Sequence, residues 1–166
     1  MGEYFSYVNH SKQLYFGTDL IAHNPKFSGI GHTIGTRAFE LLLVLPEGHN
    51  PRCTQHPLIG SWIGDKVAII GDQGKAGDFC QKYQDITANM IVLLYKVNGA
   101  EYLLEIAKKN KYFFAALGYM ISTNQLPEIA SDFEHEFGEY WMKRHKEDLR
   151  EYAPYNLYLI QLEKYL

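Results

Sequence analysis

Two aspartates in the stretch from Gly60 to Asp72 are the first residues of this chain that could do chemistry. The stretch reads Gly-Ser-Trp-Ile-Gly-Asp-Lys-Val-Ala-Ile-Ile-Gly-Asp, so a glycine precedes both Asp65 and Asp72. Paired carboxylates can act as general acid and base or bind a metal. However, the run between them predicts a strand, which at about 3.3 Å per residue holds them about 23 Å apart. We therefore interpret each aspartate as a turn residue.

Both aspartates are kept as candidate ligand-binding residues. Asp72 is favoured because it follows the predicted strand and precedes a glycine-rich loop. Ligand-binding groups are often presented by loops at the ends of rigid elements.

Two glycine-rich loops carry residue types that suit an anion site. Residues 71–77 read Gly-Asp-Gln-Gly-Lys-Ala-Gly, but the glycine spacing is too short for a P-loop, and Ala76 replaces the hydroxyl that such a loop needs. Residues 29–35 hold three glycines around His32, ahead of a predicted helix. We interpret both loops as linkers and keep Lys75 and His32 as candidates for binding a small anionic ligand.

A cluster of histidine and cysteine has the local spacing of a zinc site. His49, Cys53 and His56 lie close together in the sequence, and Cys80 is a distant candidate for the fourth ligand. No fourth ligand is supplied locally, and loops that contain these residue types are common. The sequence therefore predicts no bound metal and no other cofactor.

The composition favours a globular protein of ordinary type. The chain has 166 residues, enough for one domain with a proper core, and its formal net charge of −3 does not favour nucleic-acid binding. Two cysteines do not make the framework of a secreted protein, and residues 2–12 do not resemble a signal peptide. The longest apolar runs are far shorter than the roughly 20 residues that span a bilayer. We expect a cytoplasmic protein without membrane association.

Strand and helix patterns divide the chain into two parts. In residues 1–98, we expect a hairpin of strands 4–8 and 13–16, a helix over 36–44 with Thr36 as N-cap, a strand over 66–70, and a helix over 86–97 capped by Asp85. Residues 99–166 predict helices over 100–110, 112–122, 127–152 and 155–166. We expect a single α+β domain over residues 1–166, with a small, mainly antiparallel sheet, packed helices and a C-terminal helical layer.

The predicted helix over 127–152 carries an apolar residue or histidine at every fourth position. Such a row drifts about 40° around the helix at each step. Its two ends therefore cannot face one flat surface. We expect either a bend near Gly138, where glycine would allow close packing, or two separate packing partners.

Several of these motifs together resemble a widespread family of small uncharacterised proteins. Members begin with a strand of the type Met-Gly-x-Tyr-x-x-Val-Asn, which residues 1–9 resemble with three residues in place of two between Tyr4 and Val8, and carry a Gly-Ser-Trp-x-Gly-Asp box, as residues 60–65 do. An apolar strand that ends in Gly-Asp follows the box, and residues 83–87 are similar to a further family segment. The resemblance covers about residues 1–90 and implies kinship of fold, with no activity attached.

The aromatic residues near the C-terminus predict an interaction surface. One domain of this size can bury only part of the set, and tyrosine and tryptophan are enriched at protein interfaces. We therefore expect a non-enzymatic binding or protein-interaction protein that binds itself, most simply as a homodimer, or another protein. The candidate interface residues are Trp141, Tyr152, Tyr155 and Tyr158. The alternative is a small hydrolase or transferase that acts at a loop site with histidine and aspartate, although no nucleophile motif accompanies these residues.

Overall fold

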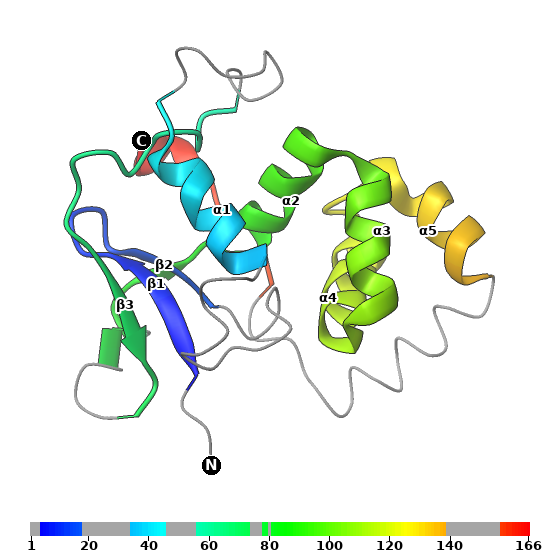
Figure 1. Ribbon diagram of the computed structural model, residues 1–166, viewed down its shortest axis with the longest axis horizontal. Coiled ribbons are helices and arrows are strands. Elements are labelled where there is room, and N and C mark those ends of the chain that lie inside the picture. Colours follow the sequence, from blue (N-terminus) through cyan, green and yellow to red (C-terminus); the bar gives the residue numbers. More distant parts are fainter. Residues whose placement is uncertain (1–3, 18–33, 46–55, 74–77, 80, 139–156) are drawn as a thin grey trace.

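The computed structural model describes residues 4–17, 34–45, 56–73, 78–79, 81–138 and 157–166. They form an α+β fold with a four-stranded sheet at one end and a helical layer at the other (Figure 1). The expected fold class is therefore confirmed. No helix among the described residues is both long enough and apolar enough to cross a membrane.

The sheet is mainly antiparallel and has the order β3-β1-β2-β4. Strand β1 pairs antiparallel with both β2 and β3, and β2 pairs parallel with β4. The expected hairpin is present as β1 and β2, and the strand expected after the Gly-Ser-Trp-x-Gly-Asp box is β3. The bounds are Phe5–Asn9 for β1, Leu14–Gly17 for β2, Val67–Gly71 for β3 and Gln84–Asp85 for β4.

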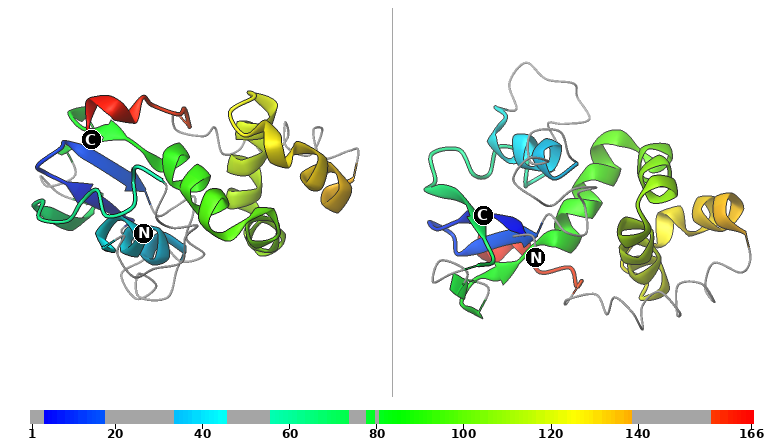
Figure 2. Two further views of the ribbon diagram at one scale, coloured as in Figure 1. Left: turned by 90° about the horizontal axis from the view of Figure 1, so that it is seen from above. Right: turned by 60° about the horizontal axis from the view of Figure 1, so that its bottom comes forward.

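The helices form two groups that one helix connects. Helix α1 packs on the sheet, whereas α3, α4 and α5 make the C-terminal helical layer, and α2 runs from the sheet to this layer (Figure 1, Figure 2). Two short 3-10 helices, η3 and η4, lie among the C-terminal residues. The bounds are Ile34–Leu43 (α1), Thr87–Asn98 (α2), Ala100–Lys109 (α3), Lys111–Ser122 (α4), Pro127–Ile129 (η3), Ala130–Phe137 (α5) and Leu162–Lys164 (η4).

Short polar residues and one glycine separate α2, α3 and α4. The Asp85 carboxylate accepts hydrogen bonds from the backbone N–H and the hydroxyl of Thr87, at 2.8 and 2.6 Å, where α2 begins. Gly99 has a φ of 88°, which turns the chain sharply between α2 and α3. The side chain of Asn110 accepts from the N–H groups of Tyr112 and Phe113 and so caps α4. Gly99 and Asn110 therefore mark the two boundaries between these helices.

Two helical expectations were wrong in their extent. The helix expected over 127–152 is α5, which ends at Phe137 because Gly138 takes a φ of 80°. A Cβ at Gly138 would meet nothing within 4 Å, so this glycine serves the turn and not close packing. Of the helix expected over 155–166, residues 157–161 are not helical, and η4 is the only regular element within the described residues 157–166. Residues 139–156 lie outside the described chain.

Helix α1 begins two residues before the expected start. Thr36 therefore lies in its first turn and not at the N-cap. Its hydroxyl shares a hydrogen bond of 3.0 Å with the Tyr7 hydroxyl on β1. This contact links the helix to the sheet.

Trp62 is the largest side chain of the core and is fully buried. Its ring lies 6.0 Å from that of Phe16 on β2 and 6.1 Å from that of Phe39 on α1, measured between centroids. Trp62 lies in the turn formed by residues 57–65, which we call the tryptophan turn. Its backbone N–H donates to the carbonyl of Leu42, which ties this turn to the C-terminal end of α1. Trp62 therefore holds the tryptophan turn, α1 and the sheet together.

We expect Trp62→Ala to lower the free energy of unfolding by about 3–5 kcal/mol, because it leaves a large cavity between sheet and helix. Trp62→Phe should cost less, because no described residue accepts a hydrogen bond from the buried indole N–H. Denaturant unfolding of both variants measures the two losses. A Trp62→Ala protein as stable as the wild type would contradict a core role.

Candidate functional site

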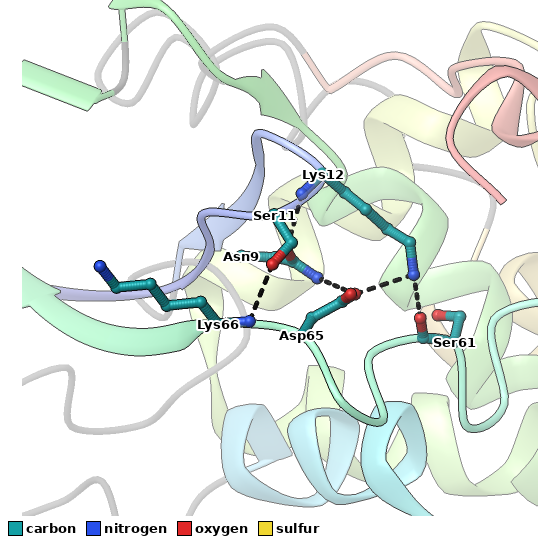
Figure 3. A network of polar contacts seen from close by, with 6 residues as sticks. All are labelled: Asn9, Ser11, Lys12, Ser61, Asp65 and Lys66. Atoms are coloured by element: carbon teal, nitrogen blue, oxygen red, sulfur yellow. Dashed lines mark hydrogen bonds and ion pairs between the residues drawn. The ribbon is translucent and has the colours of Figure 1, made fainter.

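A network of polar residues joins the turn between β1 and β2 to the tryptophan turn. Figure 3 shows its members, which meet around the carboxylate of Asp65. We call it the carboxylate network. Its residues are Asn9, Ser11, Lys12, Ser61, Asp65 and Lys66.

Asn9 is the buried residue of the network. It ends β1 with no exposed surface, so both ends of its amide need partners. Its oxygen accepts from the backbone N–H of Lys12 at 2.9 Å, and its nitrogen donates to Asp65 at 2.8 Å. Asn9 thus shapes its own turn and holds the carboxylate of another one.

Lys12 is the cationic partner of Asp65. Its ammonium lies 2.8 Å from Oδ2 of Asp65 and also donates to the carbonyl of Ser61. Nearby, the Ser11 hydroxyl accepts from the backbone N–H of Lys66 at 2.9 Å. The hairpin turn is therefore bound to the tryptophan turn at several points.

These contacts determine the ionisation of Asp65. Partial burial disfavours the charged form, but hydrogen bonds from Lys12 and Asn9 and the charge of Lys12 outweigh it and lower the pKa of Asp65 below its ordinary value. The carboxylate is therefore ionised near neutral pH and already holds two donors on Oδ2. It serves best as a structural anion.

Asp72 lies at the other end of β3. Its Oδ1 accepts from the backbone N–H of Tyr4 at 3.0 Å, and its own N–H donates to the carbonyl of Tyr4 at 2.8 Å. Asp65 and Asp72 thus tie the two ends of β3 to the β1–β2 hairpin, and the structure does not bring them together as a pair.

His56 is the one zinc candidate that the structure describes. Its Nδ1 accepts from the backbone N–H of Leu58 at 3.2 Å, and burial, followed by the charge of Lys96, lowers its pKa. Within the described ranges, no three histidine, cysteine, aspartate or glutamate side chains are grouped to hold a metal. Several residues that the sequence suggested for zinc, anion or interface sites lie outside the described ranges: His32, His49, Cys53, Lys75, Cys80, Trp141, Tyr152 and Tyr155.

Two hollows on the described residues lie in the helical part. One, of about 570 Å³, is bounded by α3, the start of α4 and the end of α5, and the other, of about 220 Å³, lies where α1 faces the α3–α4 junction. Neither is lined by His56, Asp65 or Asp72. In the first hollow, Lys108 is paired with Glu105 at 2.6 Å and Glu136 at 2.8 Å.

Two side-chain amides bind residues 157–160, which we call the C-terminal strap. Asn89 on α2 donates to the carbonyl of Ile160 and accepts from its N–H, both at 3.2 Å. Gln125, after α4, donates to the carbonyl of Leu157 at 2.9 Å and accepts from the N–H of Leu159 at 2.8 Å. Both amides therefore bind backbone and leave the strap's side chains free for other contacts.

Tyr158 is the one candidate interface residue that the structure describes. It is 56% exposed, and the Tyr119 hydroxyl donates to its hydroxyl at 2.7 Å. That hydrogen bond, followed by burial, raises the pKa of Tyr119 to about 12.

The contacts of Asn89 and Gln125 with the C-terminal strap were not predicted from the sequence. Asn89 offered one signal, because it is a polar residue within the apolar stretch Ala-Asn-Met-Ile-Val-Leu-Leu of a predicted helix. Gln125 offered none, because it lies in a polar turn.

Comparison of the chain with protein-family models, with curated proteins and with solved structures finds no match. The resemblance of residues 1–90 to a family of small proteins therefore stays a prediction.

We expect Asp65→Asn to lower the free energy of unfolding by about 1–3 kcal/mol at pH 7, because it removes the charged acceptor of Lys12 and Asn9. The folded-state pKa is lowered, so this stabilisation is complete above about pH 4 and is lost as the pH falls through the folded-state pKa. Urea unfolding from pH 7 to pH 3 should show the gap between the two proteins closing. Asp132→Asn, at an exposed carboxylate on α5, is the control, and an equally pH-dependent loss there would contradict the assignment.

Proposed function

We propose that this chain is a non-enzymatic protein-interaction protein whose surface between α2 and Gln125 binds an extended segment of a partner protein. The observation that carries the proposal is the binding of the C-terminal strap by the amides of Asn89 and Gln125. Under this proposal, the strap occupies the surface between α2 and Gln125 when no partner is bound.

The amides contact the strap as a neighbouring strand would. Gln125 bonds the carbonyl of Leu157 and the N–H of Leu159, which is the pattern that one residue of a parallel strand makes with residues on either side of its neighbour. Asn89 bonds both groups of the single residue Ile160, as in an antiparallel pair. Recognition through main-chain hydrogen bonds is a common way to bind extended peptides.

Side-chain burial along the strap indicates where specificity arises. Leu157 is 1% exposed and belongs to the core cluster, whereas Tyr158 and Leu159 are 56% and 39% exposed. Burying one leucine side chain contributes about 1.5–3 kcal/mol. The surface therefore favours a segment with an apolar anchor at the first position and tolerates variation at the next two.

The alternative function, a small hydrolase or transferase with a loop site, has less support. Asp65 binds Lys12 and Asn9, and Asp72 accepts from the N–H of Tyr4, so both candidate aspartates already have partners within the chain. The strap surface offers recognition groups of defined geometry.

A partner segment has to compete with the strap. A surface that is free in only a fraction of molecules binds with an affinity reduced by that fraction. Weakening the strap should therefore strengthen binding in trans, which gives the proposal a direct test.

The test uses the full chain with Leu157→Asp, which places a charge in the anchor position and should release the strap. A fluorescent peptide with the sequence of residues 157–166 should bind this variant at least tenfold more tightly than it binds the wild type, as measured by fluorescence anisotropy. Adding Asn89→Leu to the variant should abolish that gain, because it removes two hydrogen bonds to the peptide backbone.

The control is the same peptide with aspartate in place of its first leucine, which should bind neither protein. Circular dichroism and thermal unfolding check that Leu157→Asp stays folded. If that variant unfolds, the test is made on the wild type by hydrogen exchange with excess peptide. Displacement of the strap should then speed the exchange of the amides of Leu159 and Ile160. Equal binding by both proteins, or no exchange change at saturating peptide, would contradict the proposal.

A further inference from the structure

Strand β3 forms one edge of the sheet, and among the described strands only β1 pairs with it. Figure 1 shows β3 at the side of the sheet away from α2. Natural edge strands are usually protected by charges, prolines or bulges, because an open edge is a template for pairing with another chain. Residues 67–71 of β3 are Val-Ala-Ile-Ile-Gly, with no such protection.

The hydrogen bonds to β1 show which groups of β3 face outward. The N–H of His10 donates to the carbonyl of Lys66, and the N–H of Asp72 donates to the carbonyl of Tyr4. Backbone groups alternate in direction along an antiparallel strand. Residues 66, 68, 70 and 72 therefore face β1, whereas the N–H and carbonyl groups of Val67, Ile69 and Gly71 face the open edge.

The same strand is complementary to itself. We infer that two copies of this chain pair their β3 strands antiparallel about a two-fold axis at Ile69, which makes one continuous sheet from both molecules. In this register Val67 pairs with Gly71 of the other copy, and Ile69 pairs with its own counterpart. Every outward group of the strand then has a partner.

Charge complementarity favours this register. The axis at Ile69 places Lys66 opposite Asp72 of the other copy, and this pair occurs twice. Both side chains are exposed, and Figure 3 shows the Lys66 side chain directed away from the Asp65 carboxylate, because Lys66 joins the network through its backbone N–H. An axis between two residues would set outward groups against groups that already bond β1, and an axis at Val67, Ala68, Ile70 or Gly71 would no longer place Lys66 opposite Asp72.

The apolar contact of the interface is Ile69. It is 42% exposed although it lies opposite Tyr7, a fully buried core residue on the same face of the sheet. Pairing with its counterpart would cover the part of this side chain that the monomer leaves open. The inference concerns a different surface from the strap and does not depend on the proposed peptide binding.

Charge reversal tests the register by sedimentation equilibrium over a concentration series. The wild type should dimerise. Lys66→Asp and Asp72→Lys should each raise the dimer dissociation constant at least tenfold, because each places like charges opposite one another twice. An equimolar mixture of the two variants should associate as a heterodimer with a constant near that of the wild type, because both pairs then have opposite charges again.

Two further variants separate this surface from others. Ile69→Pro removes an outward N–H that does not pair with β1 and should give a monomer. Tyr158→Ala alters the exposed aromatic residue of the strap and should leave the constant unchanged. A wild type that stays monomeric at millimolar concentration would overturn the inference, and so would a dimer that neither charge reversal weakens or a variant mixture that does not associate.

Discussion

The ion pair between Asp65 and Lys12, completed by Asn9, is the contact on which the sheet end of the molecule depends. It joins two turns that are 49 to 56 residues apart in the chain and sets where β3 begins. The tryptophan turn lies just before β3, so the same contact helps to keep Trp62 between the sheet and α1. Without the carboxylate, the buried amide of Asn9 would lose an acceptor, which is costly where water cannot replace it.

Residues that end or begin elements allowed much of the fold to be predicted. Asp85 and Gly99 lie at the start of α2 and at the break between α2 and α3, and each acts through its own backbone neighbourhood, so the signal is local in sequence. The hairpin and β3 were predictable for the same reason, from short β-branched and aromatic runs between turn residues. The cap of α4 by Asn110 was not predicted, because this residue was assigned to the end of the preceding helix. The end of α5 was predicted only as a bend near Gly138, one of two alternatives, because the apolar row continued past this glycine and the sequence does not specify its left-handed conformation.

The candidate sites were predicted less well than the fold, because their contacts are distant and involve backbone. Asp65 was singled out from its motif, but its partners on the hairpin turn could not be identified from spacing. Asn89 and Ile160 are 71 residues apart, and the group that Asn89 binds is a peptide unit that every residue has. No choice of side chain at position 160 therefore signals the contact.

Helix α2 has a consequence for how the molecule comes apart. Residues 86–91 are buried without interruption over more than one full turn, so this part of the helix is enclosed on every side. The sheet, α1 and the C-terminal helical layer all contribute to that enclosure, so neither the sheet end nor the helical layer can open without exposing apolar surface of α2. Subglobal opening at this helix would cost nearly as much free energy as global unfolding. The amide protons of α2 should belong to the slowest-exchanging set, and the sheet end and the helical layer should melt as one cooperative unit.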